Sequence, residues 1–125
     1  MIHTILIVDD EPFNCRVLKL KFENAGYKVV AALNGLDGLD KFRTESPDVV
    51  ITDINMPVMD GREMCSSLRE IGCGRQFLTI VMTSLVDKAE MVWVDKLENI
   101  IFIEKPLSPN KLLSKVEEYF KKSVL

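Results

Sequence analysis

The sequence has few cysteines, no long apolar run and only a small excess of charge of one sign. No apolar stretch approaches the ~20 residues that a membrane-spanning helix needs, and the amino terminus lacks the basic segment of a secretory signal. The formal net charge of -3 at pH 7 argues against a general surface for nucleic acid or for an anionic membrane. We therefore expect a cytoplasmic protein that binds neither nucleic acid nor membrane directly.

The three cysteines, Cys15, Cys65 and Cys73, are odd in number and have neither metal-like nor redox-like pair spacing. Free thiols in a reducing cytosol fit this pattern. Glycine is also sparse, and no glycine-rich phosphate loop follows the first apolar run, which argues against a flavin or nucleotide site. The one histidine, His3, lies near the amino terminus, where we expect it to be solvated.

The sequence does contain enough apolar residues for one folded domain. It has 125 residues, of which 47% are hydrophobic and 28% are charged. These values are typical of a globular domain and not of a disordered chain. No repeat, linker or low-complexity segment divides the sequence, so we expect a single domain.

Five short apolar runs alternate with segments in which apolar residues recur at helical spacing. Runs that are apolar throughout are typical of parallel strands buried on both faces, and the amphipathic segments between them are typical of covering helices. The predicted strands are residues 5–8, 29–33, 49–53, 77–82 and 100–103, and the predicted helices are residues 12–25, 36–43, 64–71, 87–96 and 109–120. The pattern predicts an α/β protein with a parallel five-stranded sheet covered on both faces.

Residue types that start helices or form turns mark the boundaries of these segments. Pro12 and Pro109 suit the first turn of a helix, and Ser108 is the expected N-cap of the last helix. The pair Asn34 and Gly35 predicts a turn that closes the second strand.

Polar residues follow four of the predicted strands at the point where each strand ends. Asp9 and Asp10 follow the first strand, Asp53 ends the third, Thr83 follows the fourth and Lys105 follows the fifth. Right-handed crossovers bring all these strand ends to one edge of the sheet, where ligands bind in such folds. Three carboxylates in one pocket repel each other unless a cation lies among them, and Mg2+ suits such a site. The ammonium group of Lys105 can bind phosphate oxygens. Together with the three carboxylates and a cation, it forms an arrangement suited to receiving a phosphoryl group.

Each of these residues, taken singly, has an ordinary structural explanation. Asp53 alone is more often a turn or helix-cap residue, and Asp9 with Asp10 is more often a helix start. Thr83 alone is a strand end, and Lys105 alone a solvated lysine. The functional interpretation therefore depends on all of them occurring together after four different strands.

Several motifs of the sequence resemble those of the receiver domain of two-component response regulators. The likeness covers essentially the whole chain, and the order and spacing of the motifs are specific. The motifs are residues 6–11 (LIVDDE), 53–57 (DINMP), 59–61 (MDG), 82–84 (MTS) and 104–106 (EKP). The resemblance implies a flavodoxin-like (βα)5 three-layer sandwich with strand order 2-1-3-4-5, formed by residues 1–125 as a single receiver domain without an effector domain.

The resemblance also implies a role for each acidic residue. Asp53 resembles the aspartate that accepts the phosphoryl group. Asp10 resembles the direct Mg2+ ligand, Asp9 assists through water, and the backbone carbonyl of Asn55 completes the metal site together with Asp53. The protein would then be a signalling receiver that catalyses only its own phosphorylation and dephosphorylation.

Three further residues resemble the family's switch residues. Thr83 resembles the hydroxyl that moves onto the phosphoryl group, Lys105 the lysine that holds it, and Phe102 the switch aromatic. The implied phosphodonor is a histidine kinase or a histidine phosphotransfer protein. The implied output is a changed surface of helix four, strand five and helix five, recognised by an unknown output protein, in a monomer or a phosphorylation-dependent dimer.

Two other classes of protein remain as alternatives. An aspartyl-phosphate phosphohydrolase needs a second aspartate two residues after the nucleophile as general acid, and this sequence has Asn55 there, which cannot act as an acid. A scaffold that keeps the fold without being phosphorylated is the other alternative. It is disfavoured because all the acceptor-site residues are present.

Overall fold

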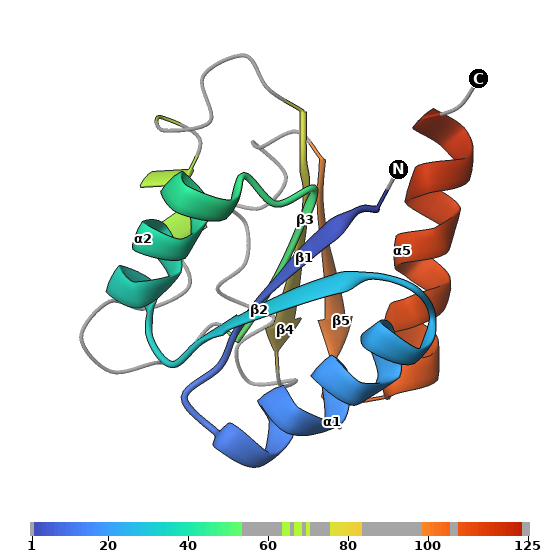
Figure 1. Ribbon diagram of the computed structural model, residues 1–125, viewed down its shortest axis with the longest axis horizontal. Coiled ribbons are helices and arrows are strands. Elements are labelled where there is room, and N and C mark those ends of the chain that lie inside the picture. The colour runs from blue at the N-terminus through green and yellow to red at the C-terminus, as the bar shows by residue number, and fades with distance from the viewer. Residues whose placement is uncertain are drawn as a thin grey trace.

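The computed structural model of the chain describes residues 2–53, 64–65, 67–68, 70, 76–83, 99–105 and 108–123. Five parallel strands form one sheet in the order β2-β1-β3-β4-β5 (Figure 1). The strands are β1 (Thr4–Val8), β2 (Lys28–Ala32), β3 (Val49–Asp53), β4 (Leu78–Thr83) and β5 (Ile100–Glu104), and the helices are α1 (Pro12–Asn24), α2 (Gly35–Glu45) and α5 (Pro109–Ser123). The flavodoxin-like class and the strand order predicted from the sequence are confirmed.

The two central strands are buried on both faces. The side chains of Ile5, Leu6, Ile7 and Val8 in β1 have no exposed surface, and every residue of β3 is buried. Burial on both faces explains the continuous apolar runs in the sequence. The exceptions are Thr52 and Asp53, which are buried polar residues at the carboxyl end of β3. The predicted fourth helix, at residues 87–96, lies outside the described residues.

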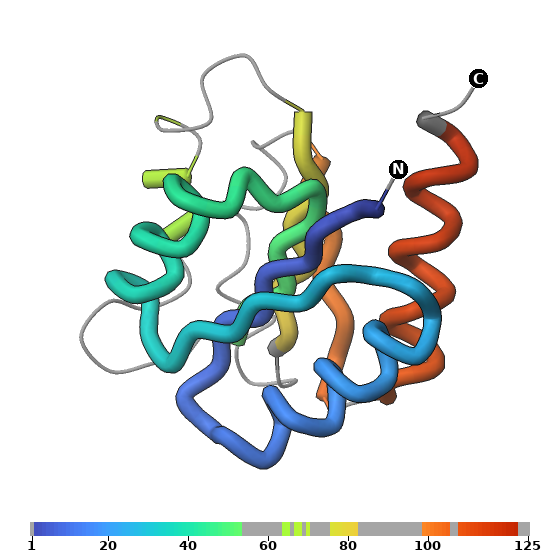
Figure 2. Tube along the Cα trace, in the orientation of Figure 1, coloured from blue at the N-terminus to red at the C-terminus, as the bar shows by residue number. Residues whose placement is uncertain are grey.

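Alternate residues of β1, β2 and β3 belong to two separate cores. Ile5 and Ile7 of β1 belong to the core beneath α1 and α5, whereas Leu6 and Val8 belong to the core beneath α2 and the helical residues Met64 and Leu68. Figures 1 and 2 show α1 and α5 on one side of the sheet and α2 on the other. The chain therefore forms three layers, as the alternation of apolar strands with amphipathic segments predicts.

Two predicted boundary residues have the roles of helix caps. Ser108 Oγ accepts a hydrogen bond from the Lys111 amide at 3.3 Å, so the predicted N-cap of α5 is confirmed. Asn34 does not merely close a turn: its side chain accepts a hydrogen bond from the Asp37 amide at 2.9 Å, and Gly35 is the first residue of α2. The two turn residues thus start the helix directly after β2.

His3 is not the solvated residue that its place near the amino terminus predicts. Its ring stacks on Phe120 of α5, with ring centroids 3.8 Å apart, and its Nδ1 lies 3.5 Å from Asp48 Oδ2. The amino terminus runs beside α5 in Figure 1. The expectation was wrong because α5 returns across more than a hundred residues of sequence to cover the start of β1.

No helix among the described residues is long and apolar enough to cross a membrane.

Gly38 supplies a close approach between α2 and the sheet. A Cβ at this position would lie 2.9 Å from Met64 Sδ and 3.0 Å from Val8 Cγ2. The sulfur ends a flexible side chain, but Val8 is fixed in the central strand. The absence of a side chain at this helical position is therefore required by packing.

We predict that Gly38→Ala lowers the free energy of unfolding by about 1–3 kcal/mol, because overpacking against Val8 outweighs the gain in helix propensity. Urea denaturation measures the change. Leu36→Ala, on an exposed position of the same helix, is the control and should change it by less than about 0.5 kcal/mol. A Gly38→Ala variant more stable than the wild type would show that the gain in helix propensity exceeds the cost of overpacking against Val8.

Candidate functional site

The register of the central strands places two acidic residues side by side. Val8 of β1 pairs with Thr52 of β3, so Asp9 and Asp53, the next residues of each chain segment, lie next to each other at the carboxyl edge of the sheet. Parallel strands end at the same edge, as the sequence pattern predicts, and the pairing of β1 with β3 makes the two residues neighbours at that edge. The predicted meeting of the two side chains is found in the structure.

Asp9, Asp10 and Asp53 form one cluster. A carboxylate oxygen of each lies within 4.8 Å of one from the other two. Asp9 and Asp53 are buried, with 1% and 6% of their surface exposed, whereas Asp10 is exposed. Oxygen ligands of this kind, with one side open to solvent, fit a hard divalent cation such as Mg2+ better than a soft metal.

Lys105 reaches the cluster from the carboxyl end of β5, an edge strand of the sheet. It follows β5 directly, and its Nζ lies 2.8 Å from Asp53 Oδ1. The Lys105 side chain is 40% exposed while that of Asp53 is 8% exposed, so the ion pair lies at the mouth of the buried site. The ammonium group compensates the charge of Asp53 where three carboxylates meet.

Asp9 is held by the start of α1. The Glu11 amide donates a hydrogen bond to its Oδ1 at 2.9 Å, and Asn14 Nδ2 donates one to its Oδ2 at 3.3 Å. Burial nevertheless raises the pKa of Asp9, and the nearby charge of Asp53 raises the pKa further. Burial and the charge of Asp53 therefore disfavour the ionised form of Asp9 by more than its two hydrogen bonds favour it.

The two contacts to Asp9 were not predicted from the sequence. The Asn14 side chain reaches Asp9 because α1 begins shortly after the end of β1, and its residue type alone does not distinguish it from other polar helix residues. A usable signal was its place in the first turn of the helix that follows the acidic pair, where side chains face the preceding loop.

Cys15 lies beneath the cluster and takes no part in its chemistry. Its Sγ donates a hydrogen bond to the Asp9 carbonyl at 3.5 Å, and burial raises the pKa of the thiol to about 11. A thiol with so high a pKa is not a nucleophile near neutral pH. Cys15 and Cys65 do not take part in a disulfide, as predicted, and Cys73 lies outside the described residues.

The remaining predicted site residues are described only in part. The backbone of Thr83 ends β4, where it pairs with Glu104 of β5, and Phe102 of β5 pairs with Val81. Phe102 is 36% exposed. Asn55, predicted to contribute a backbone carbonyl to the metal site, lies outside the described residues.

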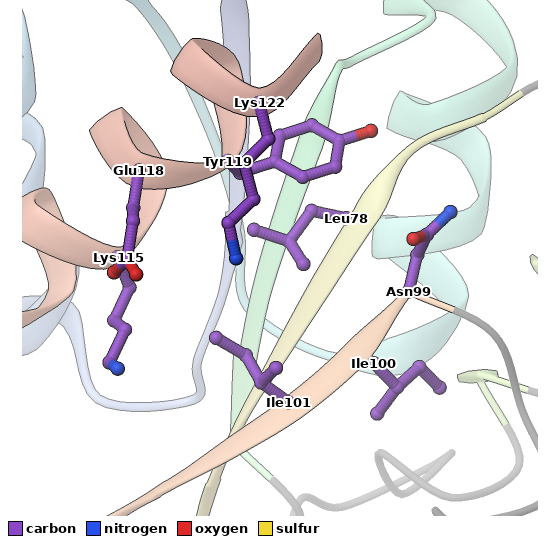
Figure 3. A pocket seen from close by; sticks show the side chains of 8 residues that line it. All are labelled: Leu78, Asn99, Ile100, Ile101, Lys115, Glu118, Tyr119 and Lys122. Atoms are coloured by element: carbon purple, nitrogen blue, oxygen red, sulfur yellow. The ribbon is translucent and has the colours of Figure 1, made fainter.

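A cavity of about 310 Å3 lies between the sheet and α5, at the other edge of the molecule (Figure 3). Leu78 lines it from the sheet, and Tyr119 and Lys122 line it from α5. Asn99, another lining residue, precedes β5, whereas Lys105 follows it. Because a strand of this length spans roughly 17 Å, the cavity is separate from the carboxylate cluster.

The fold and the arrangement at its carboxyl edge define a class of protein. A doubly wound (βα)5 sheet that carries three acidic residues and a lysine at the ends of strands β1, β3 and β5 is typical of signalling domains of the receiver type. The family model "Response regulator receiver domain" matches residues 5–117. The chain belongs to this family and is a receiver domain of two-component signal transduction.

Relatives of known sequence or structure support this assignment. The chain is 31% identical over 119 residues to the alkaline phosphatase synthesis transcriptional regulatory protein PhoP of Bacillus subtilis, a match that covers 95% of this chain and 49% of that protein. The chain thus spans about half the length of the curated relatives that it matches.

Solved structures of the same fold include single receivers and parts of kinases. The chemotaxis protein CheY4 of Vibrio cholerae superimposes with a TM-score of 0.85 at 25% identity, covering 94% of this chain and 98% of that one. The signal receiver domain of a signal transduction histidine kinase from Syntrophus aciditrophicus gives a TM-score of 0.81 at 32% identity, covering 93% and 88%. The same architecture therefore occurs in both settings.

We predict that Asp9→Asn stabilises the cation-free protein at pH 7 by about 0.5–2 kcal/mol, because it removes a buried charge that Asp53 repels. The folded-state pKa of Asp9 lies above the ordinary value of 3.8, so the folded protein binds this proton more tightly than the unfolded chain does. The free energy of unfolding therefore falls as the pH rises from 3.8 through the raised pKa. The advantage of the variant should vanish below pH 3.8.

Urea denaturation in a chelating buffer, repeated across pH, measures this difference. Asp40→Asn is the matched control, since Asp40 is exposed and pairs only at the surface with Arg43. Its effect should stay within about 0.5 kcal/mol at all pH values. A less stable Asp9→Asn variant at pH 7 would mean that the hydrogen bonds from Glu11 and Asn14 outweigh the cost of the charge.

Proposed function

We propose that this receiver accepts a phosphoryl group on Asp53, in the presence of Mg2+, from a histidine kinase or a histidine phosphotransfer protein. The observation that carries the proposal is the 2.8 Å contact between Lys105 Nζ and Asp53 Oδ1 inside a cluster of three carboxylates. A buried aspartate that is both ion-paired and next to two other acids is oriented for nucleophilic attack and has a partner ready for phosphate oxygens.

The transfer step uses Asp53 as the nucleophile. A carboxylate oxygen forms a bond to phosphorus while the phosphorus–nitrogen bond of a donor phosphohistidine breaks, and the imidazole leaves with the electron pair. Lys105 fixes the carboxylate beforehand through Oδ1. Its ammonium is a compact charge on a flexible stem, so it follows the charge onto the phosphoryl oxygens as the new bond forms.

The cation site of the proposal consists of Asp9, Asp10 and Asp53, with the backbone carbonyl of Asn55 as a further ligand. Bound Mg2+ would neutralise the charge that develops on the phosphoryl oxygens. Asp10 is the exposed member of the cluster, so its carboxylate is accessible to a cation from solvent. Asp9 is fixed by its hydrogen bonds and supplies negative charge at a constant position.

The chemistry of this site is signalling and not turnover of other substrates. The receiver catalyses only its own phosphorylation and dephosphorylation, and the information lies in the state of Asp53. We propose that residues 1–125 act as one receiver domain in the cytoplasm, without direct contact to nucleic acid or membrane, as a monomer or a phosphorylation-dependent dimer. An output protein recognises the phosphorylated form.

The switch that we propose links Asp53 to β5 through Thr83 and Phe102. Phosphorylation adds about -1.5 to -2 charges beside Asp53, and the hydroxyl of Thr83 moves to donate to the new oxygens. Because β4 and β5 are paired, with Val81 opposite Phe102, a shift at the end of β4 alters the packing of Phe102. The surface of helix four, β5 and α5 then changes; helix four lies outside the described residues.

We predict that acetyl phosphate with Mg2+ adds the mass of one phosphoryl group to the intact protein. Intact-mass spectrometry measures the modified fraction. Asp53→Asn should remain unmodified because an amide is not a nucleophile toward phosphorus. Asp40→Asn removes an exposed carboxylate that is not part of the cluster, so this variant should be modified like the wild type. Modification of Asp53→Asn to the wild-type extent would place the acceptor elsewhere and overturn the proposal.

We predict that beryllofluoride, bound with Mg2+ as a mimic of the phosphoryl group, changes amide NMR shifts beyond the site itself. The affected amides should include those of β5 near Phe102 and the start of α5, because these residues follow the paired end of β4. The Phe102→Ala variant should lose the distant part of this change and keep the changes near Asp53. Shifts that stop at Thr83 in the wild type would contradict the proposed output surface.

A further inference from the structure

Both carboxylate oxygens of Asp9 are engaged by the first turn of α1. The Glu11 amide holds Oδ1 at 2.9 Å, and the side-chain amide of Asn14 holds Oδ2 at 3.3 Å. Asp9 is 1% exposed, so few other groups compete for these oxygens. The plane of the carboxylate is therefore fixed by two donors from one helix end.

The position of Asn14 is itself fixed. It is the third residue of α1, after Pro12 at the first helical position, and the next residue, Cys15, is buried against the sheet. Leu18 and Phe22 anchor the same helix in the core. A rigid helix of this kind keeps the Asn14 amide beside Asp9 without the freedom of a loop residue.

The two hydrogen bonds restrict how Asp9 can meet a cation. Each carboxylate oxygen has about two lone-pair sites, so Asp9 keeps one site per oxygen for a water or a cation. Bidentate chelation requires the free sites of both oxygens to face the same ion. The two donors from α1 fix the plane of the carboxylate, so Asp9 cannot rotate to turn both free sites toward a cation between Asp10 and Asp53. Ca2+ takes six to eight oxygens and readily accepts bidentate carboxylates, whereas Mg2+ keeps several waters and strict octahedral geometry.

We propose that Asn14 is a positioning residue that gives the site its preference for Mg2+ over Ca2+. By holding Oδ2 while the Glu11 amide holds Oδ1, Asn14 prevents Asp9 from swinging in as a bidentate ligand of the larger ion. Asn14 touches neither cation nor phosphoryl group and acts through Asp9 alone. The inference rests on the proposed cation site of Asp9, Asp10 and Asp53.

Isothermal titration of the unphosphorylated protein with MgCl2 and, separately, with CaCl2 tests this proposal. In Asn14→Leu, which has a similar volume and no donor, the ratio of the Ca2+ to the Mg2+ dissociation constant should fall by about tenfold, the lower end of the effect of outer-shell partners. If the role of Asn14 is merely structural, Asn14→Leu weakens the binding of Mg2+ and of Ca2+ by the same factor and leaves the ratio of the dissociation constants unchanged. Asn14→Gln keeps an amide donor and should restore part of the wild-type ratio.

A double-mutant cycle identifies the route of the effect. In an Asp9→Asn background, Asn14→Leu should no longer change the ratio, because the carboxylate through which Asn14 acts is gone. Lys19→Leu, on the exposed side of the same helix, is the matched control and should leave the ratio as in the wild type. Far-UV circular dichroism checks that each variant is folded, and Asn14→Ala, which also lacks a donor, replaces Asn14→Leu if the latter is not folded.

The outcomes separate this inference from the function on which it rests. If the wild type binds Mg2+ and Asn14→Leu leaves the Ca2+ to Mg2+ ratio unchanged, the role of Asn14 is overturned and the receiver function stands. If Asn14→Leu changes the Ca2+ to Mg2+ ratio equally in the wild-type and the Asp9→Asn backgrounds, Asn14 does not act through the Asp9 carboxylate and the proposal fails. If the wild type binds neither cation, the proposed metal site fails, and the role of Asn14 fails with it.

Discussion

Mutual repulsion of carboxylates in a partly buried site is the constraint on which the rest of this structure depends. Asp9, Asp10 and Asp53 are brought within 4.8 Å of one another by strands that cannot separate, because β1 and β3 are hydrogen-bonded neighbours at the centre of the sheet. Burial makes the charged form of Asp9 more costly still. A site of this kind persists only where the surrounding fold is stable enough to hold it.

The fold meets this cost in two ways. Direct compensation comes from Lys105, which pairs with Asp53 at 2.8 Å, and from the α1 donors that hold Asp9. The remainder is met at a distance by two cores, one on each face of the sheet, which fix the strands from both sides. The close packing of α2 at Gly38 belongs to this support, since it brings the helix against Val8, the residue directly before Asp9. Stability in the cores thus permits strain at the site.

Lys105 also joins the acidic cluster to the surface from which a signal would be read. It follows β5, the strand that carries the exposed ring of Phe102, and it contacts Asp53 across the intervening strand β4. A change in charge at Asp53 therefore acts directly on Lys105, the residue that follows β5. The same receiver fold occurs in solved structures of a chemotaxis protein and of the receiver domain of a histidine kinase.

The sequence by itself determined the parts of the structure that depend on neighbouring residues and on strand direction. Continuous apolar runs required buried parallel strands, Ser108 marked the start of α5, and the common edge of parallel strands brought Asp9, Asp53 and Lys105 together. Strand boundaries were shifted by about one residue in β2 and β4, because periodicity says little about where pairing stops.

Only the tertiary structure decided which residues far apart in the chain, or on a turning helix, meet. The stacking of His3 on Phe120, the contact of Gly38 with Val8 and Met64, and the hold of Asn14 on Asp9 follow from how helices dock on the sheet. Local patterns specify which face of a helix is buried but not its position along the sheet to within an ångström. Close packing of side chains from both partners sets that position, and with it the fine geometry of the site.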